Sequence, residues 1–352
     1  MPEIVADSKT VTSEWLTEVL VHAGHACQVA EFSATTIGMG QVGHNVRFTL
    51  TYGSGSGPGS IVGKFMSDDA VSRTTGIAQN TYLKEVRFYQ QMLPTLDVQT
   101  PRLLFTDIDA ETHEFCLLME DLAPAVQGDQ ITGCSARDAA TALTELANLH
   151  GPRWSDPSLH RYDWISPTDE AAAELGEALY KQLFPAFVDR YRDRLTADHV
   201  RVAERFGDSF KDWSLGYEGP TTVTHGDYRL DNLLFGGPYP VTVVDWQTVG
   251  IGAGAADLAY FLGAGLNTED RRRYEQRLVR RYHDALQFKG VSDYTFEECW
   301  DHYRRYSFSG VLMAVIASMI VGRTERGDDM FVAMLSRHAQ QAIDLHAVDF
   351  LS

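Results

Sequence analysis

The pattern of apolar and polar positions changes character along the chain. In the first third, short runs rich in β-branched and aromatic residues predict strands, because these residues suit a pleated, half-buried surface. Two stretches with apolar residues at helical spacing, residues 12–23 and 81–93, predict helices among the strands. The five predicted strands are residues 29–37, 46–52, 61–66, 102–107 and 115–119.

After about residue 122 most apolar residues recur at helical spacing. Two helix starts carry a capping-box pattern, in which a Ser or Thr is followed three residues later by an acid, at Ser135 and Thr295. Pro185 is expected to kink or split the helix around it, because proline lacks the backbone N–H. Helices are predicted over residues 135–150, 168–195, 196–213, 268–288 and 295–321, from Asp257 onward, and within 328–346.

One stretch combines strand-like runs with a set of polar residues. It covers residues 221–247 and reads TTVTHGDYRLDNLLFGGPYPVTVVDWQ. The turn signal Gly236-Gly237-Pro238 separates two apolar runs and predicts a hairpin. A polar loop before the hairpin and the end of its second strand are expected to bring Asp227, Asn232 and Asp245 close together.

These three side chains are the set that phosphoryl transfer requires. One carboxylate orients a hydroxyl group and accepts its proton, while an amide oxygen and a second carboxylate hold Mg²⁺ against the phosphates. The spacing His225-Gly226-Asp227, four residues, Asn232, and then Asp245-Trp246-Gln247 resembles the paired motifs of protein-kinase-like enzymes. The versions in this chain are most similar to the aminoglycoside phosphotransferase and choline-kinase-like families of small-molecule kinases. The resemblance implies Asp227 as the catalytic residue and Asn232 and Asp245 as the metal ligands.

A glycine-rich segment lies between the first two predicted strands. Gly38, Gly40 and Gly43 have the spacing G-x-G-x-x-G, but no helix follows them, which excludes a dinucleotide-binding fingerprint. The setting fits a kinase-type loop whose backbone closes over phosphates. Lys64, in an apolar strand downstream, is expected to bind the phosphates of ATP, and Glu85 on the next helix is expected to pair with it.

The residues after the fifth predicted strand are interpreted from their position in the resembled fold. There, Met119, Glu120 and Leu122 correspond to an extended hinge whose backbone hydrogen-bonds the adenine edge. An acid at the start of a later helix, Asp257, resembles a residue that braces the catalytic loop; an N-terminal helix acid favoured by the helix dipole explains it equally well.

The resemblance covers roughly residues 32–261 and implies an α+β, two-lobed protein-kinase-like fold. The expected lobes are residues 1–121, which would bind the nucleotide through a five-stranded antiparallel sheet with one main helix, and residues 122–352, mostly helical, for catalysis and acceptor binding. No Ala-Pro-Glu sequence follows Asp245, which argues for a small hydroxylated acceptor and against a protein substrate. ATP and Mg²⁺ are the implied cofactors.

Composition narrows the function further. The net charge of -18 argues against a nucleic-acid binder, which requires a basic surface, and is compatible with a cationic substrate. The four cysteines are scattered, and the first residues lack the pattern of a signal peptide, so a cytoplasmic protein without a disulfide framework is expected. The most apolar stretch, residues 311–321, is too short to span a bilayer, so no membrane partner is expected.

Several alternatives stay open at this stage. The motif Asp-Trp-Gln, where many aminoglycoside-type enzymes have Asp-Trp-Glu, is compatible with a choline- or ecdysteroid-kinase-like kinase for another metabolite. A catalytically inactive nucleotide-binding module and an acidic interaction protein are alternatives of other classes. The sequence leaves open the acceptor, a role in antibiotic resistance, the choice of ATP or GTP, and whether the chain is a monomer or a homodimer.

Overall fold

The computed structural model describes residues 1–38 and 43–351. The chain forms two compact units, each with its own apolar core. The first comprises Met1–Thr95, Thr100–Ala125 and Val244–Thr248. The second comprises Leu96–Gln99, Val126–Val243 and Val249–Ser352.

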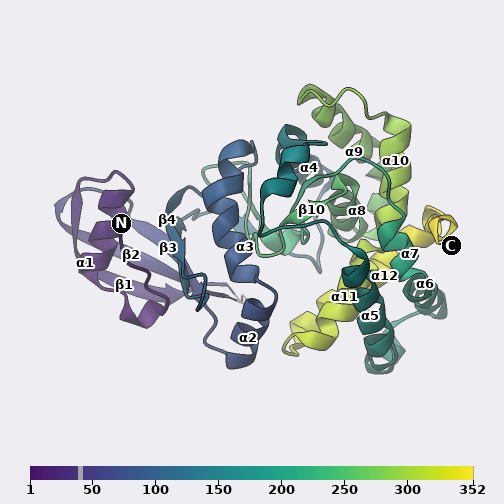
Figure 1. The fold of residues 1–352 in the computed structure, drawn as a ribbon, viewed down its shortest axis with the longest axis horizontal. Helices are drawn as coiled ribbons and strands as arrows, with labels where there is room; N and C mark the ends of the chain where they lie inside the picture. The colour runs from purple at the N-terminus through teal and green to yellow at the C-terminus, as the bar shows by residue number, and fades with distance from the viewer. Residues whose placement is uncertain (39–42, 352) are drawn as a thin grey trace. The chain divides into compact units, whose positions relative to one another are not determined.

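The first unit is built on a five-stranded antiparallel sheet, as the family resemblance implied (Figure 1). Its strand order is β1-β2-β3-β5-β4, so β5 lies inside the sheet and β1 and β4 form the edges. Strand β2 extends three residues beyond the end of the strand predicted over residues 46–52. The strands are β1 (Cys27–Thr36), β2 (Gly43–Gly55), β3 (Ser60–Met66), β4 (Leu103–Ile108) and β5 (Phe115–Glu120).

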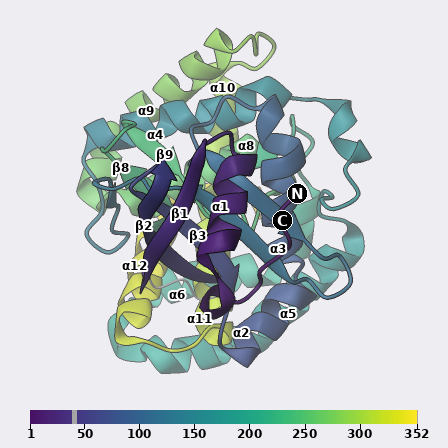
Figure 2. The ribbon, with the colours of Figure 1, turned by 90° about the vertical axis from the view of Figure 1, so that its left-hand side faces the viewer.

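Helix α1 (Ser13–His22) covers one face of this sheet (Figure 2). The side chain of Thr12 caps the helix by accepting a hydrogen bond from the backbone N–H of Trp15. Trp15, Leu16, Val19 and Leu20 are buried in the core of the first unit together with side chains of the sheet. The predicted helix over residues 12–23 is therefore confirmed within one residue at each end.

The other helices of this unit differ from the sequence prediction. Helix α2 (Ala70–Ala78) was not predicted, because only Gly76 within it is buried and no apolar stripe marks it. The predicted helix over residues 81–93 is divided into α3 (Thr81–Arg87), a π-helical turn (Phe88–Met92) and a 3₁₀ turn (Leu93–Thr95). A π turn widens the helix by one residue and so turns the side chains that follow it to new directions.

The second unit is mostly helical. Helices α5, α6, α8, α11 and α12 contribute side chains to one apolar core. The helices are α4 (Ala136–His150), α5 (Glu170–Tyr191), α6 (Ala197–Asp208), α7 (Phe210–Leu215), α8 (Gly254–Gly265), α9 (Thr268–Phe288), α10 (Phe296–Arg305), α11 (Ser309–Ile320) and α12 (Glu325–Asp344).

Most of these helices match the predicted stretches, with three corrections. The predicted helix over residues 196–213 is two helices, α6 and α7. Helix α5 is not split, since it continues through Pro185. The predicted helix over residues 295–321 is two helices separated by a 3₁₀ turn at Tyr306–Phe308. At Thr295 the capping box is complete, because Thr295 and Glu298 each accept a hydrogen bond from the other's backbone N–H. Within residues 1–38 and 43–351, no helix is both long and apolar enough to cross a membrane.

Short strands in the second unit position the polar stretch around Asp227. The predicted hairpin is present: β8 (Leu233–Phe235) pairs antiparallel with β9 (Val241–Val243). The other side of β8 pairs with β6 (Val126–Gln127). Strand β7 (Thr222–Thr224) pairs instead with β10 (Gly250–Gly252), which lies in a glycine-rich segment where no strand was predicted. The loop carrying Asp227 therefore connects two different small sheets.

Candidate active site

In the first unit, Lys64, Glu85 and Asp245 form one ion cluster. The Nζ atom of Lys64, on β3, lies 2.9 Å from Oε1 and 2.8 Å from Oε2 of Glu85, on α3. The same Nζ lies 3.0 Å from Oδ1 of Asp245. The pairing of Lys64 with Glu85 that the sequence predicted is present, and Asp245 is a second carboxylate on the same ammonium group.

The cluster holds a charged lysine in a buried position. Burial alone would lower the pKa of Lys64, but the nearby carboxylates of Asp245 and Glu85 outweigh it and raise the pKa above its usual value. Lys64 and Glu85 are buried, whereas the side chain of Asp245 is 41% exposed. The cluster therefore offers one accessible carboxylate beside a fixed cation.

The backbone around Asp245 is held in an uncommon conformation. Asp245 has a φ angle of 67°, in the left-handed region that non-glycine residues seldom adopt. The next residue, Trp246, is fully buried and stacks on Phe88 with ring centroids 3.8 Å apart and planes 9° apart. The backbone N–H of Trp246 donates to Oε1 of Glu85 at 3.3 Å. Since Phe88 begins the π turn, that irregular turn and the stacked tryptophan together help to fix Asp245.

The predicted glycine loop is described at two of its three glycines. Gly38 has a φ angle of 70°, a conformation that glycine adopts without strain. At Gly43 an added Cβ would lie 2.8 Å from Cε of Lys64, so a larger residue there would have to displace the lysine side chain. Gly40 lies outside the described residues, and its role stays a prediction.

The predicted hinge residues Met119, Glu120 and Leu122 follow the inner strand β5. Met119 faces Val62 of β3 and Leu103 of β4 in the strand register. Met119 and Leu122 are buried and Glu120 is half-buried. These residues therefore lie at and just beyond the end of strand β5. Their contact with the adenine base of a nucleotide stays a prediction.

In the second unit, Asp227 and Asn232 lie within hydrogen-bonding distance of each other. Oδ2 of Asp227 accepts hydrogen bonds from Nδ2 of Asn232 at 2.9 Å and from Nε of Arg229 at 3.0 Å. Oδ1 accepts one from the hydroxyl of Tyr260, on α8, at 2.7 Å. Three donors thus fix the carboxylate, and Oδ1 retains a lone pair that could accept a hydrogen bond from a substrate hydroxyl.

Two of these donors were not assigned by the sequence. Burial and the charge of Asp227 raise the pKa of Tyr260 well above its usual value, so Tyr260 remains a proton donor. Burial lowers the pKa of Arg229, but the charges of Asp227, Tyr260 and Asp231 and the hydrogen bond to Asp227 together outweigh it, and the net shift of the pKa is upward. A signal for Arg229 was present, since it lies two residues after Asp227, whereas no local pattern connects Tyr260, 33 residues away, with Asp227.

Asp257 anchors the backbone of the same loop. Its Oδ2 accepts from the backbone N–H of His225 at 2.7 Å, and its Oδ1 accepts from that of Gly226 at 2.9 Å. His150, at the end of α4, lies with Nε2 3.2 Å from Oδ2 of Asp257 and Nδ1 2.7 Å from the hydroxyl of Tyr282. Asp257 therefore fixes the backbone that precedes Asp227, in addition to lying in the first turn of α8. The buried His150 contacts the Asp257 carboxylate and helps to hold it in place.

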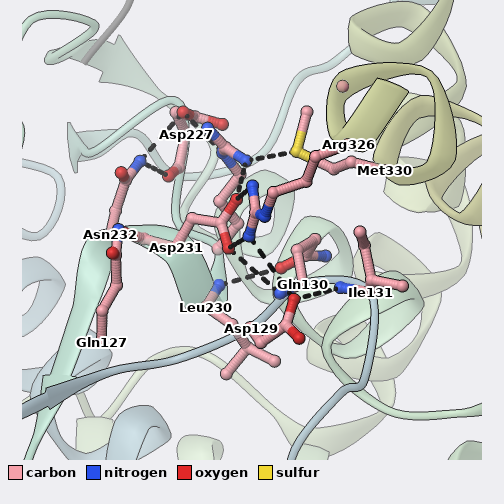
Figure 3. Close-up of polar contacts among 12 residues, drawn as sticks. Gln127, Asp129, Gln130, Ile131, Asp227, Leu230, Asp231, Asn232, Arg326 and Met330 are labelled. Atoms are coloured by element: carbon pink, nitrogen blue, oxygen red, sulfur yellow. Dashed lines mark hydrogen bonds and ion pairs between the residues drawn. The ribbon is translucent and has the colours of Figure 1, made fainter. Parts of the chain in front are cut away.

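A row of alternating charges extends from Asp227 (Figure 3). Nη1 of Arg229 lies 2.8 Å from Oδ2 of Asp231, and Nη2 of Arg326, on α12, lies 3.0 Å from Oδ1 of Asp231. Arg326 also reaches Asp129, with Nη2 3.4 Å from Oδ1. The row ties the loop to the start of α12 and to the segment before α4.

The two residues expected to bind a magnesium ion, Asn232 and Asp245, belong to different units. Nδ2 of Asn232 donates to the backbone oxygen and to Oδ2 of Asp227, which leaves the amide oxygen as the end that could meet a cation. Asp245 contributes a carboxylate in the first unit. Among residues 1–38 and 43–351, no three His, Cys, Asp or Glu side chains gather as a metal site. The expected meeting of Asp227, Asn232 and Asp245 therefore stays a prediction.

Comparison with known proteins assigns the fold. The protein described as an aminoglycoside phosphotransferase from Ralstonia eutropha has 18% sequence identity and a TM-score of 0.51, with 93% of this chain and 98% of that chain covered. An APH(2″) enzyme bound to GDP and kanamycin has 13% identity and a TM-score of 0.55, with 95% and 99% covered. A spectinomycin phosphotransferase bound to ADP and spectinomycin has 10% identity and a TM-score of 0.51, with 96% and 99% covered.

The TM-scores above 0.5 show a shared fold, and the family follows from the sequence itself. No individual curated protein matches the chain in sequence. The profile of the phosphotransferase enzyme family, APH, matches residues 68–295, more than half of the chain. The matched region contains Glu85, Asp227, Asn232 and Asp245. The chain belongs to the phosphotransferase enzyme family.

Proposed function

We propose that this phosphotransferase is a small-molecule kinase that moves the γ-phosphate of ATP to a hydroxyl group. The observation that carries the proposal is the Asp227 carboxylate, which Tyr260, Arg229 and Asn232 fix in one orientation. A fixed carboxylate with one open lone pair is suited to orient a hydroxyl group and accept its proton.

The first unit is proposed to bind the nucleotide. The ammonium group of Lys64, kept charged by Glu85 and Asp245, would neutralise phosphate oxygens. The segment containing Gly38, Gly40 and Gly43 would cover the phosphates, and Met119, Glu120 and Leu122 would border the base. The solved relatives bound to ADP and GDP support a nucleotide site without deciding between adenine and guanine.

The oxygen donors fit a magnesium ion chemically, since carboxylate and amide oxygens are ligands that Mg²⁺ accepts. We propose Asn232 and Asp245 as its protein ligands. When bound, the ion supplies positive charge that stabilises the phosphate oxygens. The chain's own residues contribute orientation: Tyr260 and Arg229 hold Asp227, and Asp257 holds the backbone that precedes it.

Most of the rate enhancement is expected from positioning and charge stabilisation, because the transition state of phosphoryl transfer is loose. We retain the lobes proposed from the sequence, residues 1–121 for the nucleotide and 122–352 for catalysis and the acceptor. A cytoplasmic location is proposed from the scattered cysteines. The relatives bound to kanamycin and spectinomycin support a small hydroxylated acceptor.

Replacement of the proposed base tests the function directly. Asp227→Asn keeps the shape of the side chain and removes the proton acceptor, so kcat for acceptor-dependent ADP release should fall by about 10²–10⁴-fold. ADP should still raise the melting temperature of the variant, because a ligand that binds only the folded state stabilises it. Asp208→Asn, at an exposed position on α6, is the matched control and should retain wild-type kcat.

Each alternative predicts a different outcome. Undiminished transfer by Asp227→Asn would refute the assignment of the base. A wild-type protein that ADP stabilises, yet that releases no ADP with any acceptor, would identify an inactive nucleotide-binding module. A protein that neither MgATP nor ADP stabilises would refute the nucleotide site altogether.

A further inference from the structure

A groove with a volume of about 840 Å³ lies between α4 and α9 on the surface of the second unit. Along α4 its lining extends from Ala136 to Asn148, which corresponds to about 18 Å, or a little over three helical turns. Small side chains line it on both helices, Ala140 and Thr144 on α4 and Ala285 on α9. The groove therefore has the length and the floor to receive one further helix.

This groove is basic, although the chain as a whole is acidic. Its lining contains five cationic residues and one acid, Asp284, whereas the whole chain has 30 Lys and Arg against 48 Asp and Glu. The cationic residues are Arg137, Arg277, Arg280, Arg281 and Lys289. The charge of the groove is thus opposite in sign to the net charge of -18, and a surface of this kind attracts anionic groups.

The four arginines of the lining are not neutralised by acids of the protein. Among residues 1–38 and 43–351, the structure shows no carboxylate in an ion pair with any of the four. Lys289 is paired, with its Nζ atom 2.9 Å from Oδ2 of Asp97. The acid of the lining, Asp284, is exposed and lies beside His283. The groove therefore offers guanidinium groups whose charge is available to a ligand.

Two of these guanidinium groups are held in place by neutral partners. Nε of Arg281 donates to the backbone oxygen of Ala140 at 3.0 Å, and Nη2 donates to the hydroxyl of Thr144 at 3.3 Å. The guanidinium carbon of Arg280 lies 3.6 Å from the centroid of the Phe296 ring. A charged group that is fixed before its ligand arrives loses little conformational freedom on binding, which favours recognition of an anion.

An exposed aromatic ring lies at one end of the groove. Phe288, the last residue of α9, is 90% exposed and belongs to the lining. Covering such a ring removes apolar surface from water, which stabilises a complex. Arginine and aromatic residues are also the types that carry most of the binding energy in protein–protein interfaces. The groove therefore fits a partner that combines negative charge with an apolar face.

We propose that the groove between α4 and α9 binds an acidic amphipathic helix of another protein. Carboxylates of that helix pair with the four arginines, because the planar donors of a guanidinium group match a carboxylate. Its apolar face covers the alanines of the floor and the ring of Phe288. The inference is independent of the kinase function proposed above.

Other occupants fit the groove less well. A long polyanion such as nucleic acid is repelled along its length by the net charge of -18 outside the groove. A second copy of this chain would have to supply an acidic helix. Helix α5 exposes acids beside an apolar residue, Leu175, but its Glu170 and Glu174 are both paired with Lys211.

Fluorescence anisotropy with the full chain and a labelled peptide tests the proposal. The peptide contains two repeats of Glu-Leu-Ala-Glu-Ala-Leu-Glu, which as a helix places its leucines on one face and glutamates around them. The comparison peptide has Gln in place of every Glu. We expect micromolar binding of the acidic peptide that weakens as salt is added, and at least tenfold weaker binding of the Gln peptide.

Charge reversal at one arginine locates the binding site. Arg277→Glu should weaken binding of the acidic peptide at least tenfold. Arg273→Glu is the matched control, because Arg273 lies one turn earlier on α9 and over the same Tyr274 ring, at 5.2 Å against 5.3 Å for Arg277, but does not line the groove. It should bind the peptide with no more than a twofold loss of affinity. Both variants should retain the wild-type melting temperature, since both side chains are exposed.

The aromatic ring is tested in the same assay. Phe288→Ser should weaken binding of the acidic peptide at least fivefold. Leu175→Ser, at a position on α5 that is 70% exposed, is its control and should bind the peptide as the wild type does. Equal affinities of Phe288→Ser and the wild type would refute an apolar contribution to the site.

The remaining outcomes each overturn part of the proposal. No binding of the acidic peptide, or equal binding by Arg277→Glu and Arg273→Glu, would refute the site. Single-stranded DNA, inorganic polyphosphate and vesicles of phosphatidylcholine with phosphatidylserine are titrated in parallel. Tighter binding of any of these than of the peptide, lost in Arg277→Glu, would refute a protein partner. Self-association in sedimentation experiments that Arg277→Glu abolishes would show that the occupant is a second copy of the chain.

Discussion

The strongest structural prediction concerns Asp257, whose carboxylate holds the backbone next to the proposed base. The side chain is 3% exposed and accepts hydrogen bonds from two backbone N–H groups, those of His225 and Gly226. Asp257→Asn keeps the size of the side chain but replaces one acceptor oxygen by an NH₂ group. That group would face a backbone N–H, so one buried donor would lose its partner.

The magnitude follows from these contacts. A buried N–H without a partner costs about 1–3 kcal/mol, and the hydrogen bond that remains loses about 1 kcal/mol with its charge. The free energy of unfolding should therefore fall by about 3 kcal/mol. For a unit of about 200 residues this corresponds to a decrease of about 6–12 °C in melting temperature.

Equilibrium unfolding in urea, followed by circular dichroism, measures the change. Asp284→Asn, at an exposed position on α9, is the control and should remain within about 0.5 kcal/mol of the wild type. In ADP-release assays, kcat of Asp257→Asn should fall while KM for ATP is retained, because the displaced backbone carries Asp227. A loss of stability below about 1 kcal/mol would refute the reasoning, since it would mean that both N–H groups still find acceptors.

The remaining predictions concern the packing of His338 against α11. Burial lowers the pKa of His338 to about 4, so the unfolded chain binds a proton that the folded chain excludes between about pH 6.5 and pH 4. The stability that this group contributes is present above about pH 6.5 and is lost on acidification to pH 4, about 3 kcal/mol in all. The free energy of unfolding of His338→Gln, measured in urea, should therefore fall less over that pH range than that of the wild type. An equal fall in both proteins would contradict it. At Gly310 an added Cβ would overlap the His338 ring, so Gly310→Ala should lower the free energy of unfolding by about 3 kcal/mol. Gly59 has open space around it, so Gly59→Ala is the control and should change the free energy of unfolding by less than about 0.5 kcal/mol in the same assay. A well-folded Gly310→Ala protein of wild-type stability would show that the ring can move.

The sequence predicted most of the local elements because their signals are short-range. The hairpin β8–β9 was recognised from two apolar runs around Gly236-Gly237-Pro238, and α9 was bounded correctly by its helical periodicity. The prediction was less successful where local signals conflict with packing. The π turn at Phe88–Met92 has ordinary helix-compatible residues, and the stacking of Phe88 on Trp246, distant in sequence, distinguishes it from a regular helix.

For the site, the sequence by itself determined which residue types are present and at what spacing. Asp227, Asn232 and Asp245 stand at intervals that indicate phosphoryl transfer, and Lys64 with Glu85 could be paired in advance because their positions resemble those of the Lys–Glu pair of protein-kinase-like folds. The spacing of residues along the chain shows which functional groups occur together in a motif, so the family could be inferred from it. It does not show which distant residues contact the proposed base Asp227.

The tertiary structure alone decided what surrounds Asp227. Tyr260 on α8, Arg326 on α12 and His150 on α4 reach the catalytic loop or its brace from positions 33 to 107 residues away in sequence from the partners they contact. No local pattern specifies such contacts, because they depend on how the helices of the second unit pack. That packing brings the hydroxyl of Tyr260 to the Asp227 carboxylate and Arg326 to Asp231, and it is the physical reason why spacing along the chain could not predict what surrounds the proposed base.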